Sequence, residues 1–333
     1  MRLSLALTLI AASVSSGAAF APATFVRSST ALQSTVEAPS SADVTARLEQ
    51  QMEKLKAKDS ASKAVAKEEL SVVFEDEHIV VVNKPSGVLC VPGKEDNAAL
   101  SKTVFEAYGS EGMENKMVVH RLGMDTSGLV VFARTMDAVR GMNSLFRTRK
   151  VNRQYEALLC GHVEADSGTI DLPLMRDYEF PPYMRVSTDD HQRALIDLDP
   201  DVVGKKLLEQ PKPSITKYEV VGREELGGQP VTRVSLTSVS GRTHQLNVHC
   251  AAFGHPIVAD STYGLDGEAA PSGGLTDAEL EELIPNASRA SADLQKEIAA
   301  AAGDKTMCVH AKSISFVHPV TKEEVSLSCD ASF

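Results

Sequence analysis

The sequence predicts a mixed α/β (α+β) domain with a largely antiparallel central sheet and flanking helices. Short runs of aliphatic and β-branched residues, each bounded by turn signals, recur from about residue 70 to residue 330 and are typical of buried strands. A stretch after Thr135 carries apolar residues at every third position, which is typical of a helix with one apolar face. Hydrophobic residues make up 43% of the 333 residues, which is enough for a sizeable core.

The first elements surround two turns. LSVVFEDEHIVVVNKPSG predicts a strand, a turn at EDEH, a second strand over Ile79–Val82 and a further turn at KPSG. Residues 101–108 predict a short helix capped by Ser101. The run LVVFA predicts another buried strand, and the apolar-faced helix starts at Thr135.

The second half of the chain continues this alternation. QYEALLCGHV predicts a strand, and residues 214–256 predict two long strands paired as a hairpin, then a loop and a helix. Residues 264–304 are acidic, prone to form helices and interrupted by Gly and Pro, so we expect a surface insertion and not a domain. A last strand pattern begins at Met307.

The amino-terminal residues differ from this body. Residues 1–35 combine an apolar stretch, small residues and an acid-free Ser/Thr segment, which predicts a targeting presequence. The join GAAFAP resembles that of two-part plastid presequences, so we expect the plastid (chloroplast), with secretion as the alternative. Residues 36–69 predict a linker or amphipathic segment, in which 43–67 suit either a helix or an exposed tether. No other segment is apolar enough to span a membrane, and we expect no stable membrane association.

Charge and cysteine content limit the function classes. The formal net charge of −11 argues against non-specific polyanion binding, so any nucleic-acid contact requires a local basic face. The five cysteines are widely spaced without a C-x-x-C pair, which indicates reduced thiols in a non-oxidising compartment. The sequence has no phosphate-cradling glycine loop, G-x-S-x-G or H-E-x-x-H motif, which argues against nucleotide-dependent and common hydrolase classes.

A compact polar turn lies between two apolar runs. The stretch VVHRLGMDTSGLVVFART holds His120, Arg121 and an isolated carboxylate, Asp125, directly before a buried strand. We expect Thr126 and Ser127 to satisfy backbone groups of this turn.

A basic segment follows the predicted helix. FRTRKVNRQY contains Arg147, Arg149, Lys150 and Arg153 and no acid. We expect these cations to contact RNA phosphates, which position RNA without reading its sequence. A solvated helix end is the alternative, because cations also complement the helix dipole.

A metal site is the main alternative chemistry. VSGRTHQLNVHCAAFGHP carries His244, His249, Cys250 and His255, and imidazole and thiolate are good zinc ligands. On a strand, however, His244 and His249 point to opposite faces. We therefore favour hydrogen-bonded structural histidines and expect no metal.

Five ordered blocks of the sequence resemble the RluA-type RNA pseudouridine synthase family (RsuA/RluA-like catalytic domain). They are DEHIVVVNKPSGVLCVPG, HRLGMDTSGLVVFA, RKVNRQYEALLCG, SGRTHQLNVHCAAFGHPI and HAKSISFVHP. The resemblance implies a pseudouridine synthase fold in one catalytic domain over residues 70–333. It also implies isomerisation of a flipped-out uridine in rRNA or tRNA by an aspartate nucleophile, without metal or coenzyme. Nothing in the sequence demands more than a monomer.

The sequence departs from the family at two positions. The family turn usually reads His-Arg-Leu-Asp-x-x-Thr-Ser-Gly, and Gly123 stands at its aspartate, while Asn247 stands at the arginine that pairs with it. Three hypotheses follow. Asp125 serves as a displaced nucleophile supported by Arg121 or Arg242; or the protein is a catalytically impaired RNA-binding pseudoenzyme; or it carries out other chemistry.

The resemblance also assigns further site residues. Tyr155 matches the family's tyrosine that stacks beneath the base, with an ordinary core tyrosine as the alternative. Arg121 either flips or replaces the base or braces the turn. Arg242 and His120 are expected to bind substrate, and Lys84 to shape the pocket rim.

Overall fold

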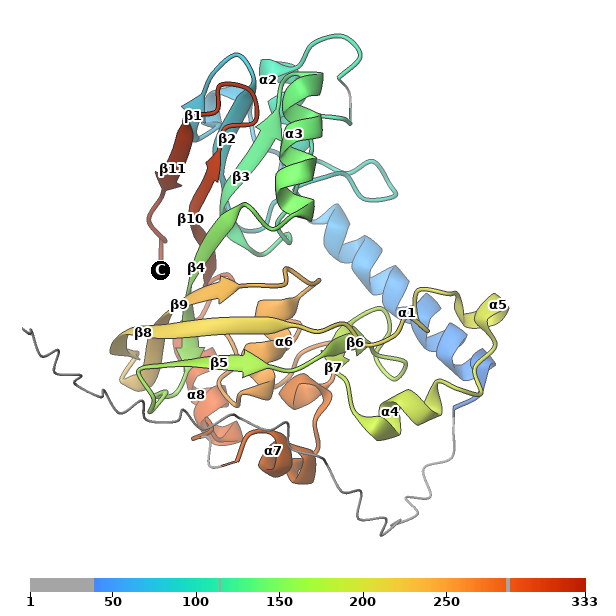
Figure 1. Ribbon diagram of the computed structural model, residues 1–333. Coiled ribbons are helices and arrows are strands. Elements are labelled where there is room, and N and C mark those ends of the chain that lie inside the picture. Colours follow the sequence, from blue (N-terminus) through green and yellow to red (C-terminus); the bar gives the residue numbers. More distant parts are fainter. Residues whose placement is uncertain (1–38, 114, 286–287) are drawn as a thin grey trace, which may run out of the picture. The chain divides into compact units, whose positions relative to one another are not determined.

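The computed structural model describes residues 39–113, 115–285 and 288–333 (Figure 1). The predicted presequence, residues 1–35, lies outside the described residues. Among the helices that the structure describes, none is both long enough and apolar enough to cross a membrane.

A nine-stranded sheet carries the fold and confirms the predicted mixed, largely antiparallel architecture (Figure 1). Its order is β1-β2-β3-β10-β4-β9-β8-β5, with β11 paired to β10, and of the named strand pairs only β3–β10 is parallel. A separate two-stranded sheet joins β6 to β7. The strands are β1 (Val72–Glu75), β2 (Ile79–Lys84), β3 (Ser127–Ala133), β4 (Asn152–Cys160), β5 (Ser167–Asp171), β6 (Leu174–Arg176), β7 (Met184–Val186), β8 (Ile215–Leu226), β9 (Gln229–Ser238), β10 (Val309–Val317) and β11 (Glu324–Ser328).

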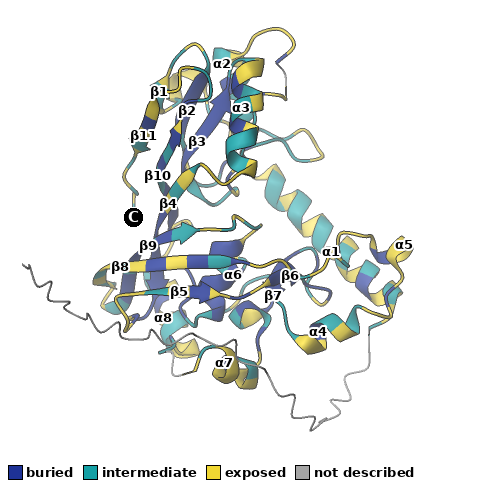
Figure 2. Ribbon diagram, viewed as in Figure 1, coloured by how far each residue is buried: buried dark blue, intermediate teal, exposed yellow. Residues whose placement is uncertain are grey.

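Different helices cover the two faces of the sheet. Successive side chains of a strand point to opposite faces, so neighbouring residues of one strand enter separate cores. Helix α3 (Met136–Arg147) buries Met142 in a core with Val81, while α6 (Gln245–Ala252) packs in the core that contains Tyr155. Figure 2 shows the strands between these helices as mostly buried. The predicted helix after Thr135 and the helix after the hairpin are confirmed.

One row of the sheet brings Lys84 and Tyr155 to the same face. Lys84 pairs with Gly128, Gly128 with Ala311, and Ala311 with Tyr155, and directly paired residues project to one side. Gly128 has a φ of +113°, and a Cβ there would lie 2.5 Å from backbone atoms of Ala311, so this close approach requires glycine. Lys84 and Tyr155 therefore flank a strip that carries only small residues.

Helix α2 (Leu100–Tyr108) begins one residue earlier than expected. Ala99 is its N-cap and no side chain caps it, so the prediction that Ser101 is the cap was wrong. The backbone N–H groups of Leu100 and Ser101 instead donate to the carbonyl oxygens of Leu89 and Cys90. The preceding loop thus satisfies amides that a cap would otherwise serve.

The segment before the sheet contains helix α1 (Ser41–Ser60), and it packs against the body at both ends. Near its start, Val44 is fully buried beside Val203 of α5 (Pro200–Val203). Beyond its end, the Lys63 N–H donates to the Gly87 carbonyl oxygen at 3.3 Å. Figure 1 shows α1 (blue) running from α5 toward the half of the sheet that holds β2 and β3.

The acidic segment 264–304 is partly built into the core. Ile298 and Ala302 are buried together with Leu158 and Cys160 of β4. By contrast, much of α7 is exposed (Figure 2). The remaining helical elements are η1 (Lys67–Glu69), α4 (Asp189–Ala194), η2 (Pro271–Gly274), α7 (Asp277–Leu283) and α8 (Ala292–Ala302).

Candidate active site

Lys84 fixes the polar turn above the strip of small residues. Its ammonium, on a residue with 0% exposure, donates to the carbonyl oxygens of Pro85, Val88 and Met124 at 2.7–2.8 Å. Three acceptors match the three protons of an ammonium group. Burial lowers the pKa of Lys84 to about 8. The Gly87 N–H also donates to the Met124 carbonyl oxygen, so the turn is tied to β2 and its loop.

The carboxylate of Asp125 pairs with a cation from the amino-terminal helix. Oδ2 of Asp125 lies 2.7 Å from Nζ of Lys58, and the two side chains are 28% and 29% exposed. The backbone of the turn is held separately, because Ser86 Oγ donates to the Asp125 carbonyl oxygen at 2.7 Å. The expected supporting cations, Arg121 and Arg242, do not fill this role: in the described chain, Lys58 alone forms an ion pair with Asp125.

Gly123 occupies an open point of the turn. A Cβ at this position would meet only Thr126 Oγ1, at 3.5 Å, within the described chain. Its φ also lies outside the left-handed region, so the local backbone accepts other residues. The turn therefore has space for a Cβ at position 123, although this sequence carries its carboxylate at Asp125.

Asn247 holds a second, buried carboxylate. Its Nδ2 donates to Oδ2 of Asp260 at 2.7 Å, and Oδ1 of Asp260 accepts the backbone N–H groups of Thr262 and Tyr263 at 2.9 and 3.0 Å. Burial raises the pKa of Asp260, and these donors and the charge of Lys58 oppose that rise. At the position where the family resemblance expects an arginine, the chain therefore has a neutral amide bonded to Asp260.

Tyr155 is buried and faces the same side of the sheet as Lys84. It is 8% exposed and belongs to the core beneath α6. The strip between the two side chains consists of Gly128 and Ala311, as the register shows. Tyr155 thus lies on the face over which the Asp125 turn is held, and its stacking against a base stays a prediction.

Arg153 and His120 both lie against Phe146. The Arg153 guanidinium is 5.6 Å from the centre of the Phe146 ring, and the His120 ring centre is 4.6 Å from it. Nε2 of His120 accepts the backbone N–H of Val131 at 2.8 Å, and burial lowers the pKa of His120 to about 3. The hydrogen bond of His120 is therefore directed to β3, and a substrate contact by this residue stays a prediction.

The end of α3 presents an exposed basic group, which we call the α3 basic end: Arg147, Arg149 and Lys150. Arg149 has a φ of +57°, and its N–H donates to the Phe146 carbonyl oxygen while that of Lys150 donates to Leu145. This is the Schellman pattern, in which glycine usually takes the left-handed position. Within the described chain, these cations form no ion pair, so their charges face solvent.

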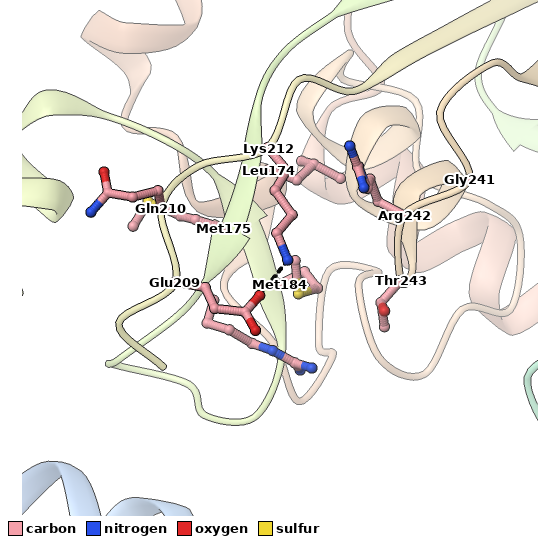
Figure 3. Close-up of a pocket in the computed structure, with 10 residues that line it drawn as sticks. Leu174, Met175, Met184, Glu209, Gln210, Lys212, Gly241, Arg242 and Thr243 are labelled. Carbon is pink, nitrogen blue, oxygen red and sulfur yellow. Dashed lines mark hydrogen bonds and ion pairs between the residues drawn. The ribbon is translucent and has the colours of Figure 1, made fainter. Parts of the chain in front are cut away.

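A second basic region surrounds a pocket of about 210 Å³ beside the β6–β7 hairpin (Figure 3). Arg176, Lys212 and Arg242 line it, and Glu209 forms an ion pair with Lys212. Arg242 thus belongs to a cationic pocket, a grouping that the sequence did not indicate. The pocket also includes Gly241, where a Cβ would lie 2.9 Å from the Arg153 guanidinium.

The histidines considered for a metal site are held by hydrogen bonds to the protein. His249 bonds Thr216 Oγ1 at 2.9 Å and the Leu172 carbonyl oxygen at 3.0 Å, and His255 bonds the Cys160 carbonyl oxygen at 2.8 Å. The strand geometry used against a metal site was wrong, because His249 lies on helix α6. The described residues contain no cluster of three or more residues suited to hold a metal ion.

Sequence reasoning missed two residues of the site. Lys58 lies in a segment rich in Ala, Lys and Glu, where nothing local distinguishes it from Lys54 or Lys56. Asp260 follows the GHP block, and only the contact with Asn247 shows its role. Both depend on contacts between distant parts of the chain.

Comparisons with known proteins identify the family of this chain. Residues 78–252 match the RNA pseudouridylate synthase family. The chain is 35% identical over 267 residues to the dual-specificity RNA pseudouridine synthase RluA of Pasteurella multocida, covering 79% of this chain and 94% of that protein. It is 40% identical over 195 residues to RluA of Vibrio vulnificus, covering 58% of this chain and 68% of that protein.

A solved structure of a pseudouridylate synthase domain is also similar to this chain. Human RNA pseudouridylate synthase domain containing 1 superposes with a TM-score of 0.56 at 25% identity, covering 81% of this chain and 87% of that one. The family match contains the Lys84 loop, the Asp125 turn, Tyr155 and Asn247, while Lys58 precedes it. The chain belongs to the RNA pseudouridylate synthase family.

Proposed function

We propose that this protein is an RNA pseudouridine synthase, an isomerase in which Asp125 is the displaced nucleophile. The observation that carries the proposal is the state of the Asp125 carboxylate. It is the only carboxylate of the turn, and its partner is the ammonium of Lys58, not a backbone amide of the described residues. A carboxylate in this state keeps its charge available for chemistry beyond the turn.

The reaction follows from the groups on this face. A uridine flips out of its RNA stack, at a cost of roughly a few kcal/mol, and its base stacks on Tyr155. The Asp125 carboxylate oxygen bonds to ribose C1′ while the bond between N1 and C1′ breaks, and the uracil leaves as an anion. The uracil then turns, and its C5 bonds to C1′ while the bond between Asp125 and C1′ breaks, which frees the carboxylate. The C5 proton leaves to a base, and N1 gains a proton from water. The isomerisation therefore balances without a redox partner.

The test is tritium release from RNA labelled at uridine C5, with wild type beside Asp125→Asn. Release by wild type and at least a 10³-fold slower rate for the variant is expected, on the order of the loss when a nucleophile is removed. Release at equal rates by both proteins would remove Asp125 from the mechanism. Circular dichroism of both proteins controls for folding.

The second candidate function is an RNA-binding pseudoenzyme. Two specific observations favour it: the open position at Gly123 and the neutral side chain at Asn247, whose amide bonds Asp260. This candidate predicts RNA binding without tritium release. The double substitution Gly123→Asp with Asn247→Arg restores the family residues. It would then create tritium release, while wild type would release none.

We further propose that the substrate is rRNA or tRNA, that the protein acts as a monomer, and that residues 1–35 direct it to the plastid. The α3 basic end and the cationic pocket support an RNA substrate. Sedimentation with and without RNA tests the monomer. A fluorescent protein fused to residues 1–35 tests the destination, and its secretion would contradict the plastid.

A further inference from the structure

We propose that Lys58, contributed by helix α1, is the positioning residue that holds Asp125 for reaction. In this role its ammonium takes the place of the arginine that the family resemblance expects at Asn247. The inference rests on the proposed function, because it concerns the geometry of the proposed nucleophile. It assigns a role to a segment that precedes the family match.

The contacts of Lys58 connect the two sides of the site. Nζ lies 2.7 Å from Oδ2 of Asp125 and 3.3 Å from Oγ of Ser261. Ser261 directly follows Asp260, the carboxylate held by Asn247, and the charge of Lys58 acts on Asp260 as well. Lys58 therefore lies between the turn that carries Asp125 and the loop that follows α6.

Asn247 does not supply this cation itself. Its side chain is neutral, and its Nδ2 is engaged by Asp260 at 2.7 Å. The Asp125 side chain is 28% exposed, so solvent carries part of its charge, and the ion pair acts mainly on where the carboxylate lies. Because Asn247 carries no charge, the cation 2.7 Å from Asp125 comes from another segment, through Lys58 of α1.

The position of Lys58 is determined by the anchoring of α1. Val44 is fully buried near the start of the helix, and Leu55 packs against the main core near its end. After the helix, Ser62 Oγ donates to the Ala98 carbonyl oxygen at 2.8 Å and accepts the Leu89 N–H at 2.9 Å. These contacts hold the last turn of α1 beside the Lys84 loop, so the ammonium is presented to Asp125 by a fixed backbone.

Single-turnover tritium release with three variants tests the role. Lys58→Met keeps the length of the side chain without its charge, Lys58→Arg keeps a cation, and Lys54→Ala is the control. Lys54 lies one helical turn earlier on α1 and is exposed. We expect Lys58→Met to slow the chemical step about 10²-fold, as for a reacting group displaced by about 1 Å, with the Kd for RNA within about threefold of wild type. Lys58→Arg recovers most of the rate, and Lys54→Ala matches wild type.

Testing Lys58→Met in a second variant of the protein separates a role in positioning Asp125 from a structural role. The double substitution Gly123→Asp with Asn247→Arg installs the family ion pair, so Lys58→Met should no longer slow the reaction there. An equal loss in both backgrounds, or a loss that appears only in the Kd for RNA, overturns the proposal. An active wild type with an unaffected Lys58→Met variant overturns only the role of Lys58. If wild type releases no tritium, the proposed function is overturned, and the positioning role of Lys58 with it.

Discussion

The side-chain amide of Asn247 donates to Oδ2 of Asp260 across 2.7 Å, and this bond joins helix α6 to the loop that follows it. Asp260 is buried, and its other oxygen accepts two backbone N–H groups. A carboxylate in such surroundings depends on its donors, because each lost partner leaves a buried acceptor without a hydrogen bond. Position 247 therefore affects stability as well as the charge of the site.

Replacing Asn247 with Leu should destabilise the protein in a pH-dependent way. The change removes one donor from Asp260, which costs about 1–3 kcal/mol at pH 7. Burial already raises the pKa of Asp260 above 3.8. A raised pKa in the folded state means that stability is present below the unfolded value and is lost as pH rises through the folded value. Loss of the donor raises this pKa further, so the destabilisation should be largest at neutral pH.

Urea unfolding of wild type and Asn247→Leu at pH 7 and near pH 4 measures this difference. The gap in unfolding free energy should shrink at the lower pH. Asn247→Asp serves as a second comparison, because it places another carboxylate beside Asp260 and should be worse at pH 7 than the leucine variant. A gap that is independent of pH would show that lost packing, not the carboxylate, causes the destabilisation.

Substitution of Lys84 should loosen the Asp125 turn. Lys84→Met fills a similar volume but leaves the carbonyl oxygens of Pro85, Val88 and Met124 without their common donor. We expect a loss of about 2–4 kcal/mol in unfolding free energy, since one buried and two partly buried hydrogen bonds from a charged donor are lost together. Lys102, which forms an exposed ion pair with Asp96, provides the control, and Lys102→Met should change stability by less than about 1 kcal/mol. Chemical denaturation checks both, and equal losses would contradict the role of Lys84.

The sheet could be predicted from sequence because its signals are local. The runs that became β2 and β3 are apolar and β-branched, and the helix after Thr135 shows its period within a few residues. The α2 cap could not be predicted, because the carbonyl oxygens of Leu89 and Cys90 replace it from a preceding loop.

Residues of the site could be predicted only where they lie in a recognisable sequence motif. The turn around Asp125 and the tyrosine at 155 lie in recognisable blocks, but the row that aligns Lys84 with Tyr155 depends on pairing between strands distant in sequence. Lys58 was not predictable, because its partner is determined by where both ends of α1 pack. A charged residue in a helix-prone segment gives no local signal of its tertiary contact.

Two substitutions in the cationic pocket beside the β6–β7 hairpin should change the affinity for RNA in opposite directions. Arg242→Ala removes a positive charge and should weaken binding, while Glu209→Gln removes the carboxylate paired with Lys212 and should strengthen it. Each change should alter the slope of log K against log salt concentration by about one or less. Filter binding of unmodified tRNA and rRNA fragments at several salt concentrations checks this. Weaker binding by both variants would indicate a change of pocket shape instead of charge.

At the α3 basic end, replacing Arg149 with glycine should raise the stability of the fold and weaken RNA binding. Its φ of +57° places a side chain where glycine is preferred, so Arg149→Gly should stabilise the fold by up to about 1 kcal/mol. The same change removes one exposed cation and should weaken RNA binding, with a smaller salt dependence. Thermal unfolding and RNA titration on the same preparation measure both effects. Arg140→Ala, which removes a cation paired with Asp137 on the same helix, controls for charge outside this end. A variant that loses both stability and affinity would show that the Arg149 side chain supports the helix end, whereas opposite changes would show that the strained arginine serves contact with RNA.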